Sequence, residues 1–173
     1  MEGFDSIFHA VESLCPVPIH FREPQVSKGC YNHLEHCIYV NEGMSQVQTL
    51  KTLIHETAHA KLHALPVKGA AVMGTPTKDQ STREVEAESI AYVVCQHFGI
   101  DTSDYSFAYV TGWSRDKKLP ELKASLDCIS TTAAEIIDAL EAACPAIART
   151  PIKPQEKNEG NLSHRETSFS EAR

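Results

Sequence analysis

The sequence predicts an α+β fold, in which a small N-terminal antiparallel sheet packs on a helix and is followed by a mostly helical C-terminal part. Two observations lead to this prediction. The short segments with strand character lie before residue 45, whereas the long segments with helical spacing of apolar residues follow it. The chain has 173 residues, which is enough for one domain with its own hydrophobic core.

The N-terminal part starts with a predicted helix over residues 4–14, whose apolar residues recur at helical spacing and which Pro16 ends. Residues 17–22 and 37–41 are predicted to be extended, and a turn near Gly29 lies between them. Together the two extended segments predict a small antiparallel sheet.

Four helices are predicted after the sheet, at residues 45–64, 81–98, 103–113 and 119–143. The first has a capping-box candidate at its start, formed by Ser45 and Gln48. The second stops before Gly99, a residue type that often follows the last turn of a helix. Residues 66–80 show no period and are predicted to form a loop.

Composition and charge exclude several classes of function. The formal net charge is −7, and an acidic chain is poorly suited to bind phosphate groups, so we expect no direct nucleic-acid binding and no membrane association. The chain begins without the pattern of a signal peptide and has no apolar run of membrane-spanning length, which predicts a cytoplasmic protein with reduced cysteines. The sequence turns polar near residue 150, so we predict a domain over residues 1–148 and a disordered tail over residues 149–173. Oligomeric state is left open.

The strongest chemical signal is the run His55-Glu56-Thr57-Ala58-His59. Two histidines four residues apart on a helix share one face, so both imidazoles can reach one ion. This is the HExxH arrangement of zincin-like metallopeptidases, in which the histidines bind zinc and the glutamate accepts a proton from water. We therefore predict one Zn²⁺ per chain, bound by His55 and His59, with Glu56 as the general base.

A catalytic zinc site needs a third protein ligand. The metzincin pattern requires glycine and histidine at the positions of Leu62 and Leu65, so that form is excluded. A carboxylate from the next predicted helix can serve instead, since Glu84 and Glu88 lie four residues apart on one face. We assign Glu84 as the metal ligand and Glu88 as the hydrogen-bond partner of a ligand histidine, and the reverse assignment remains open.

Four other side chains are weighed for a role near this site. Glu86 is about 200° around the helix from Glu84, so it is expected to face solvent. His63 is expected to lie on the surface or beside a ligand rather than to bind the same ion. Tyr105 and Tyr109 are candidate donors to an oxyanion, with core packing as the alternative.

Three segments carry a resemblance to known metallopeptidases: TLIHETAHAKLH at 52–63, REVEAESIAYVV at 83–94 and YVTGWS at 109–114. They are similar to the gluzincins, to the ImmA/IrrE metallopeptidase type and, more closely, to the polyvalent metallopeptidase domain of ArdC-like antirestriction proteins of plasmids and other mobile elements. The resemblance covers roughly residues 5–140.

This resemblance implies His55, His59 and Glu84 as metal ligands and Glu56 as the base. Glu88 departs from the ImmA/IrrE type, which has Asn or Asp at that position. ArdC-like proteins also carry a single-stranded-DNA-binding domain ahead of the peptidase, and the chain before the HExxH helix is too short and too acidic for one. The chain could therefore be a piece of a longer protein.

The function predicted from the sequence is zinc-dependent hydrolysis of a peptide bond in a protein or peptide substrate, in association with a mobile genetic element. Two alternatives stay open. One is a catalytically silent, zinc-stabilised module that acts by binding another protein. The other is a regulatory peptidase of the ImmA/IrrE type that cuts one repressor.

Overall fold

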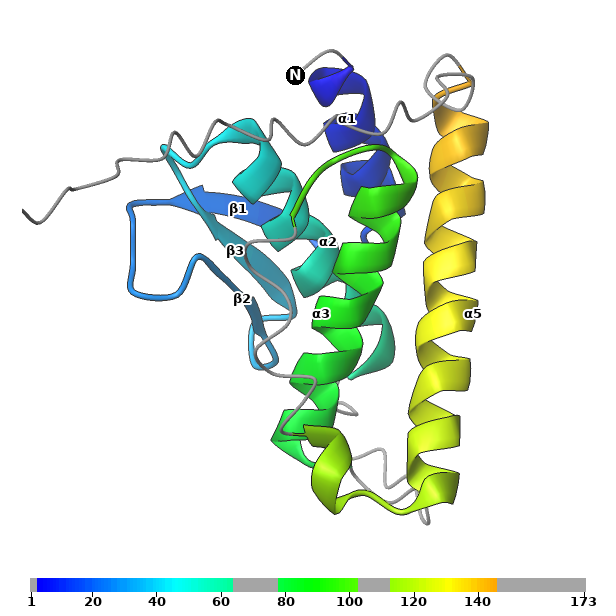
Figure 1. Cartoon of the computed structure of the whole chain (residues 1–173). Coiled ribbons are helices and arrows are strands. Elements are labelled where there is room, and N and C mark those ends of the chain that lie inside the picture. The colour runs from blue at the N-terminus through cyan, green and yellow to red at the C-terminus, as the bar shows by residue number, and fades with distance from the viewer. Residues whose placement is uncertain (1–2, 64–77, 103–112, 146–173) are drawn as a thin grey trace, which may run out of the picture.

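The computed structural model describes residues 3–63, 78–102 and 113–145 and has the expected α+β class. In chain order its elements are α1 (Phe4–Leu14), β1 (Ile19–Arg22), β2 (Gly29–Asn32), β3 (Cys37–Asn41), α2 (Gln46–Leu62), α3 (Gln80–His97), the 3-10 turn η2 (Ser114–Asp116) and α5 (Leu119–Ala143). Figure 1 shows the sheet on one side of the molecule and α5 on the other. Helix α2 packs on β2 and β3 and on α3, and α3 in turn packs on α5.

The sheet has three strands in the order β1-β3-β2. β2 pairs antiparallel with β3, and Gly29 lies opposite Val40. β1 pairs parallel with β3, and Ile19 lies opposite Ile38. The prediction of an antiparallel sheet is therefore wrong for β1, and the strand β2 was missed. The cause of both is that β2 and β3 form a hairpin, which turns β3 back into the direction of β1.

The helices follow their predicted ranges closely. α1 and α5 have the predicted bounds, so these predictions are confirmed. The side chain of Ser45 caps α2 by accepting a hydrogen bond from the backbone N–H of Gln48, at 3.2 Å. Gly99 follows α3 with a φ of 68°, a conformation that glycine adopts without strain. No helix among the described residues is long and apolar enough to cross a membrane.

Several predictions fall on residues outside the described ranges. These are the helix at 103–113 up to residue 112, the loop at 66–80 up to residue 77, and the polar tail at 149–173. The domain boundary near residue 148 stays a prediction for the same reason.

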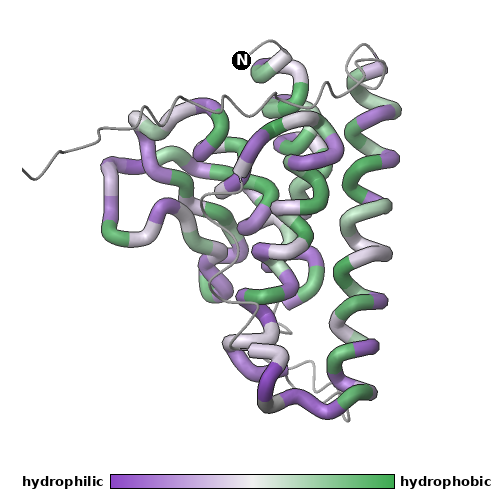
Figure 2. The backbone as a smooth tube through the Cα atoms, in the orientation of Figure 1, coloured by the Kyte–Doolittle hydropathy of each residue, from purple (hydrophilic) through white to green (hydrophobic). Residues whose placement is uncertain are grey.

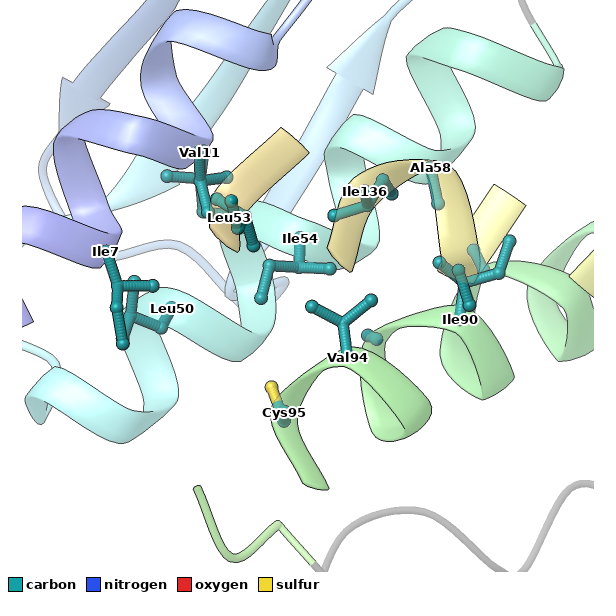
Figure 3. Packing of buried hydrophobic residues seen from close by; sticks show 14 of the residues in the cluster. Ile7, Val11, Leu50, Leu53, Ile54, Ala58, Ile90, Val94, Cys95 and Ile136 are labelled. Carbon is teal, nitrogen blue, oxygen red and sulfur yellow. The ribbon is translucent and has the colours of Figure 1, made fainter. Parts of the chain in front are cut away.

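The hydrophobic core lies where the helices meet, and α2 contributes to it along most of its length. Figure 3 shows Leu53 and Ile54 of α2 packed near Val11 of α1, Val94 of α3 and Ile136 of α5. Along α5, apolar and polar residues alternate at helical spacing, as the colouring of Figure 2 shows, and one face is buried. This packing fixes the axes of α2 and α3, the two helices that carry the candidate site.

Candidate metal centre

Three side chains from α2 and α3 converge on one point. His55 and His59 lie one turn apart on α2, and their Nε2 atoms are 3.1 Å from each other. The Oε2 atom of Glu84, on α3, is 3.6 Å from each of these two nitrogens. The structure thus brings together the three residues that the sequence analysis assigned as metal ligands, and the assignment itself stays a prediction.

The three atoms fit the ligand set of a zinc ion. Ligands of a tetrahedral zinc at about 2.1 Å from the metal lie about 3.4 Å from one another, a value between the 3.1 and 3.6 Å found here. Two imidazole nitrogens and one glutamate oxygen form a donor set that catalytic zinc sites use. Within residues 3–63, 78–102 and 113–145, this is the group of three side chains that could hold a metal ion.

The far side of each imidazole is held by a hydrogen-bond partner. The Nδ1 atom of His55 is 3.1 Å from Oε2 of Glu88, and the other oxygen of Glu88 accepts a hydrogen bond from Lys51 at 2.5 Å. The Nδ1 atom of His59 is 3.2 Å from Nδ1 of His63. Glu88 therefore occupies the place that the predicted partner of a ligand histidine requires.

The electrostatics of the cluster favour a cation at its centre. Burial alone would lower the pKa of His55, but hydrogen bonds with Glu84 and Glu88 outweigh it and raise the pKa to about 9. Hydrogen bonds with His55 and His59 in turn hold the pKa of Glu84 below its usual value. A site that stabilises an imidazolium in this way offers the same negative charge and lone pairs to a metal ion.

Glu56 lies beside the three converging side chains and is 7% exposed. Burial raises the pKa of its carboxyl group, which makes the carboxylate a stronger proton acceptor, and the backbone N–H of Tyr31 donates a hydrogen bond to it. Together with His55 and Glu88, it lines a pocket of about 340 Å³ that also includes Gly29. Glu56 thus faces space that a substrate could enter.

The absence of a side chain at Gly29 lets β2 approach α2 closely at this pocket. A Cβ atom built on Gly29 would lie 2.6 Å from Cγ2 of Thr52 and 3.1 Å from Cγ of Glu56. Both distances are shorter than ordinary contacts between carbon atoms. The close approach of β2 therefore holds the stem of Glu56 in place.

The expectation that Glu86 faces solvent is wrong. Its side chain is fully buried, with Oε2 at 3.0 Å from Nε2 of His63 and both oxygens within 2.9 Å of Nζ of Lys78. Burial would raise the pKa of Glu86, but its hydrogen bonds with His63, Lys78 and Ser125 outweigh it and lower the pKa. The face of α3 that carries Glu86 is covered by α5 and by the end of α2, which the position of Glu86 on its own helix could not reveal.

Two further residues contact the predicted ligands or their partners. For His63, which was expected on the surface or beside a ligand, the structure shows the second: the residue is buried and contacts His59. Its spacing of four from His59 repeats the spacing of His55 and His59, and this was the available signal. No sequence signal pointed to Lys51, the partner of Glu88. Tyr105 and Tyr109, the candidate oxyanion donors, lie outside the described residues.

Comparison with known proteins places the chain in a family. Residues 17–121, more than half of the chain, match the Peptidase M78 family, described as the IrrE N-terminal-like domain. The chain is also 32% identical over 126 residues to the uncharacterized protein pXO2-81 of Bacillus anthracis. That match covers 72% of this chain and 20% of the relative, so the chain spans about a fifth of the relative's length. No solved structure matches the chain.

Proposed function

Because the chain belongs to the Peptidase M78 family of IrrE N-terminal-like domains, we propose that it is a zinc-dependent peptidase that hydrolyses a peptide bond in a protein substrate. The observation that carries this proposal is the convergence of His55, His59 and Glu84, with the buried carboxyl group of Glu56 beside them. Two histidines and a glutamate would hold the metal, and a fourth position would stay open for water.

Zinc bound at such a site would act as a Lewis acid and would lower the pKa of a water molecule there to about 7. The chain's own residues supply the remaining steps. Glu56 takes the proton of the water that attacks the carbonyl carbon and passes it to the leaving amine nitrogen. Glu88 and Lys51 orient His55, and the backbone of Tyr31 orients Glu56 by donating to its carboxylate.

The family favours a regulatory peptidase of the ImmA/IrrE type, which cuts one target protein such as a repressor. The closer resemblance of residues 52–63 and 83–94 to ArdC-like proteins supports a second proposal, an antirestriction role on a mobile genetic element. Gene neighbourhood separates the two, because an adjacent repressor gene supports the first and adjacent plasmid-transfer genes support the second.

Elemental analysis of the purified protein tests the ligand set. We expect one zinc per chain in the wild type and in Glu88→Ala, and its loss in His59→Ala and Glu84→Ala. Loss in Glu88→Ala with retention in Glu84→Ala would exchange the two roles. A wild type that binds no zinc after zinc is supplied would refute the proposal.

The glutamate variant Glu56→Gln tests catalysis separately from metal binding. Zinc-loaded wild type and variant are incubated with a cell lysate, and new N-termini are identified by mass spectrometry. Cleavage is expected with the wild type and with the surface control Glu12→Gln, but not with Glu56→Gln, which keeps its zinc. Equal cleavage by Glu56→Gln would refute the role of Glu56, and cleavage by none of the three would favour a binding module that does not act as an enzyme.

A further inference from the structure

A chain of hydrogen-bonding side chains leads from His59 into the interior. Nδ1 of His59 is 3.2 Å from Nδ1 of His63, and Nε2 of His63 is 3.0 Å from Oε2 of Glu86. Lys78 closes the chain with contacts of 2.7 and 2.9 Å to the two oxygens of Glu86. The side chains of His63 and Glu86 are 3% and 0% exposed, so no solvent competes for the contact between them, whereas the side chain of Lys78 is 39% exposed.

The ion pair of Glu86 and Lys78, at the inner end of this series of side chains, sets the direction of the hydrogen bonds that lead to His59. A carboxylate paired with a lysine only accepts hydrogen bonds, so the proton on His63 must sit on Nε2, which faces Glu86. Nδ1 of His63 then carries a lone pair and accepts the Nδ1 proton of His59. With its proton on Nδ1, His59 presents the lone pair of Nε2 to His55 and Glu84.

We propose that His63 and Glu86 are positioning residues that hold His59 in the tautomer and ring orientation that bind the metal. The arrangement parallels that of the other ligand histidine, in which Glu88 contacts His55 directly and is itself paired with Lys51. On the His59 side, one imidazole is inserted between the ligand and the buried carboxylate. The inference rests on the metal site of the proposed function, but not on catalysis or on a substrate.

Packing alone does not explain the buried carboxylate of Glu86, because burying a charged group lowers the stability of the fold. The desolvation of a charged side chain amounts to several kcal/mol, and replacing a buried ion pair by apolar residues of similar size is often neutral or stabilising. Glu86 has no exposed surface, and its contacts lead to His63 and from there to a predicted metal ligand. A role in orienting His59 explains why a carboxylate occupies this position. If only packing mattered, an apolar residue would fill the same space.

The first experiment reads the tautomers directly in the metal-free full-length protein. Two-bond ¹H–¹⁵N correlation spectra distinguish a proton on Nδ1 from one on Nε2. We expect the Nε2-protonated form for His63 and the Nδ1-protonated form for His59. In Glu86→Gln, the amide can also donate, so the fixed direction is lost and both tautomers of His63 are expected. A wild-type His59 that carries its proton on Nε2 and none on Nδ1 would overturn the proposal.

The second experiment measures zinc affinity by competition with a chromophoric chelator. His63→Leu removes the hydrogen bonds, and we expect zinc to bind about 10- to 100-fold more weakly. His63→Gln keeps one acceptor and a donor, so it should recover part of this loss and serves as the test if His63→Leu does not fold. The matched control is His97→Leu, which removes a histidine–glutamate contact of 2.8 Å between α3 and α5, away from the site.

Equal zinc affinity in His63→Leu, His63→Gln and His97→Leu would overturn the proposal. The two experiments also separate it from the proposed function. If the wild type binds no zinc, the proposed function fails, while the tautomers of His59 and His63 still decide whether the hydrogen bonds have the direction inferred here.

Discussion

Replacing Gly29 by alanine tests how much the site depends on the close approach of β2 to α2. The new Cβ atom would lie 2.6 Å from Cγ2 of Thr52 and 3.1 Å from both Cγ of Glu56 and the backbone oxygen of Tyr39. Thr52 is 6% exposed and β-branched, so its methyl group cannot rotate away without a poor rotamer. The strand and the helix must therefore move apart.

The size of the effect follows from two opposing contributions. Overpacking of a well-packed site typically costs about 1–3 kcal/mol. Alanine in place of glycine within a strand returns about 0.5–1 kcal/mol. With both contributions near the middle of their ranges, the free energy of unfolding of Gly29→Ala should fall by roughly 1–1.5 kcal/mol, measured by urea denaturation.

A second substitution shows whether the contact with Thr52 is the cause. Thr52→Ser removes the methyl group that Gly29→Ala would meet, so in this background the cost of Gly29→Ala should shrink, and the double-mutant cycle gives a favourable coupling. Gly29→Ala should also slow cleavage while zinc stays bound, because the stem of Glu56 is displaced. An unchanged free energy of unfolding in Gly29→Ala, or a cost that Thr52→Ser does not reduce, would refute this reasoning.

Three further predictions concern protonation, packing and thiol reactivity. The pKa of His55 is raised to about 9 from 6.5, so His55 stabilises the metal-free protein fully below pH 6.5, and this stability is lost as the pH rises through about 9. Because His55 is protonated near neutral pH, zinc binding should release about one proton. Calorimetry in buffers of different ionisation enthalpy measures the number of protons released. A lack of proton release would contradict the contacts of His55 with Glu84 and Glu88. Ile54 is 1% exposed, so Ile54→Ala opens a cavity and should lower the free energy of unfolding by about 2–5 kcal/mol, measured by urea denaturation. A loss below about 1 kcal/mol would show that the neighbouring side chains fill the cavity. Burial raises the pKa of Cys95 to about 12, so iodoacetamide should leave this thiol unmodified in the native protein and alkylate it in urea, as mass spectrometry would show; native alkylation would contradict its burial.

Elements with a strong period could be predicted from the sequence, and those defined by pairing could not. The bounds of α1 and α5 follow from apolar residues at helical spacing, which depends on the segment alone. β2 has the residues Gly29, Cys30, Tyr31 and Asn32, which show no clear alternation, and it forms because β3 lies beside it. The direction of β1 relative to β3 likewise depends on that hairpin.

The same distinction applies to the candidate site, in which the residues of one helix could be placed from the sequence and the contacts between segments could not. His55, Glu56 and His59 are placed by a five-residue motif on one helix, so their proximity could be predicted from local geometry. The burial of Glu86 depends on Lys78 and on the end of α2, that is, on where three segments meet. A charged residue on a helix says nothing about such a meeting point, and solvent exposure was the wrong inference.

The first and the last described helices meet at one end of the molecule. The Sγ atom of Cys144, next to the end of α5, is 3.2 Å from the backbone oxygen of Ser6 in α1, and Figure 1 shows both helix ends on the same side. A fold whose ends lie side by side can be spliced into a surface loop of a larger protein with little distortion of either partner. In the relative from Bacillus anthracis, the region similar to this chain is joined to further sequence, because the matched residues make up 20% of that protein.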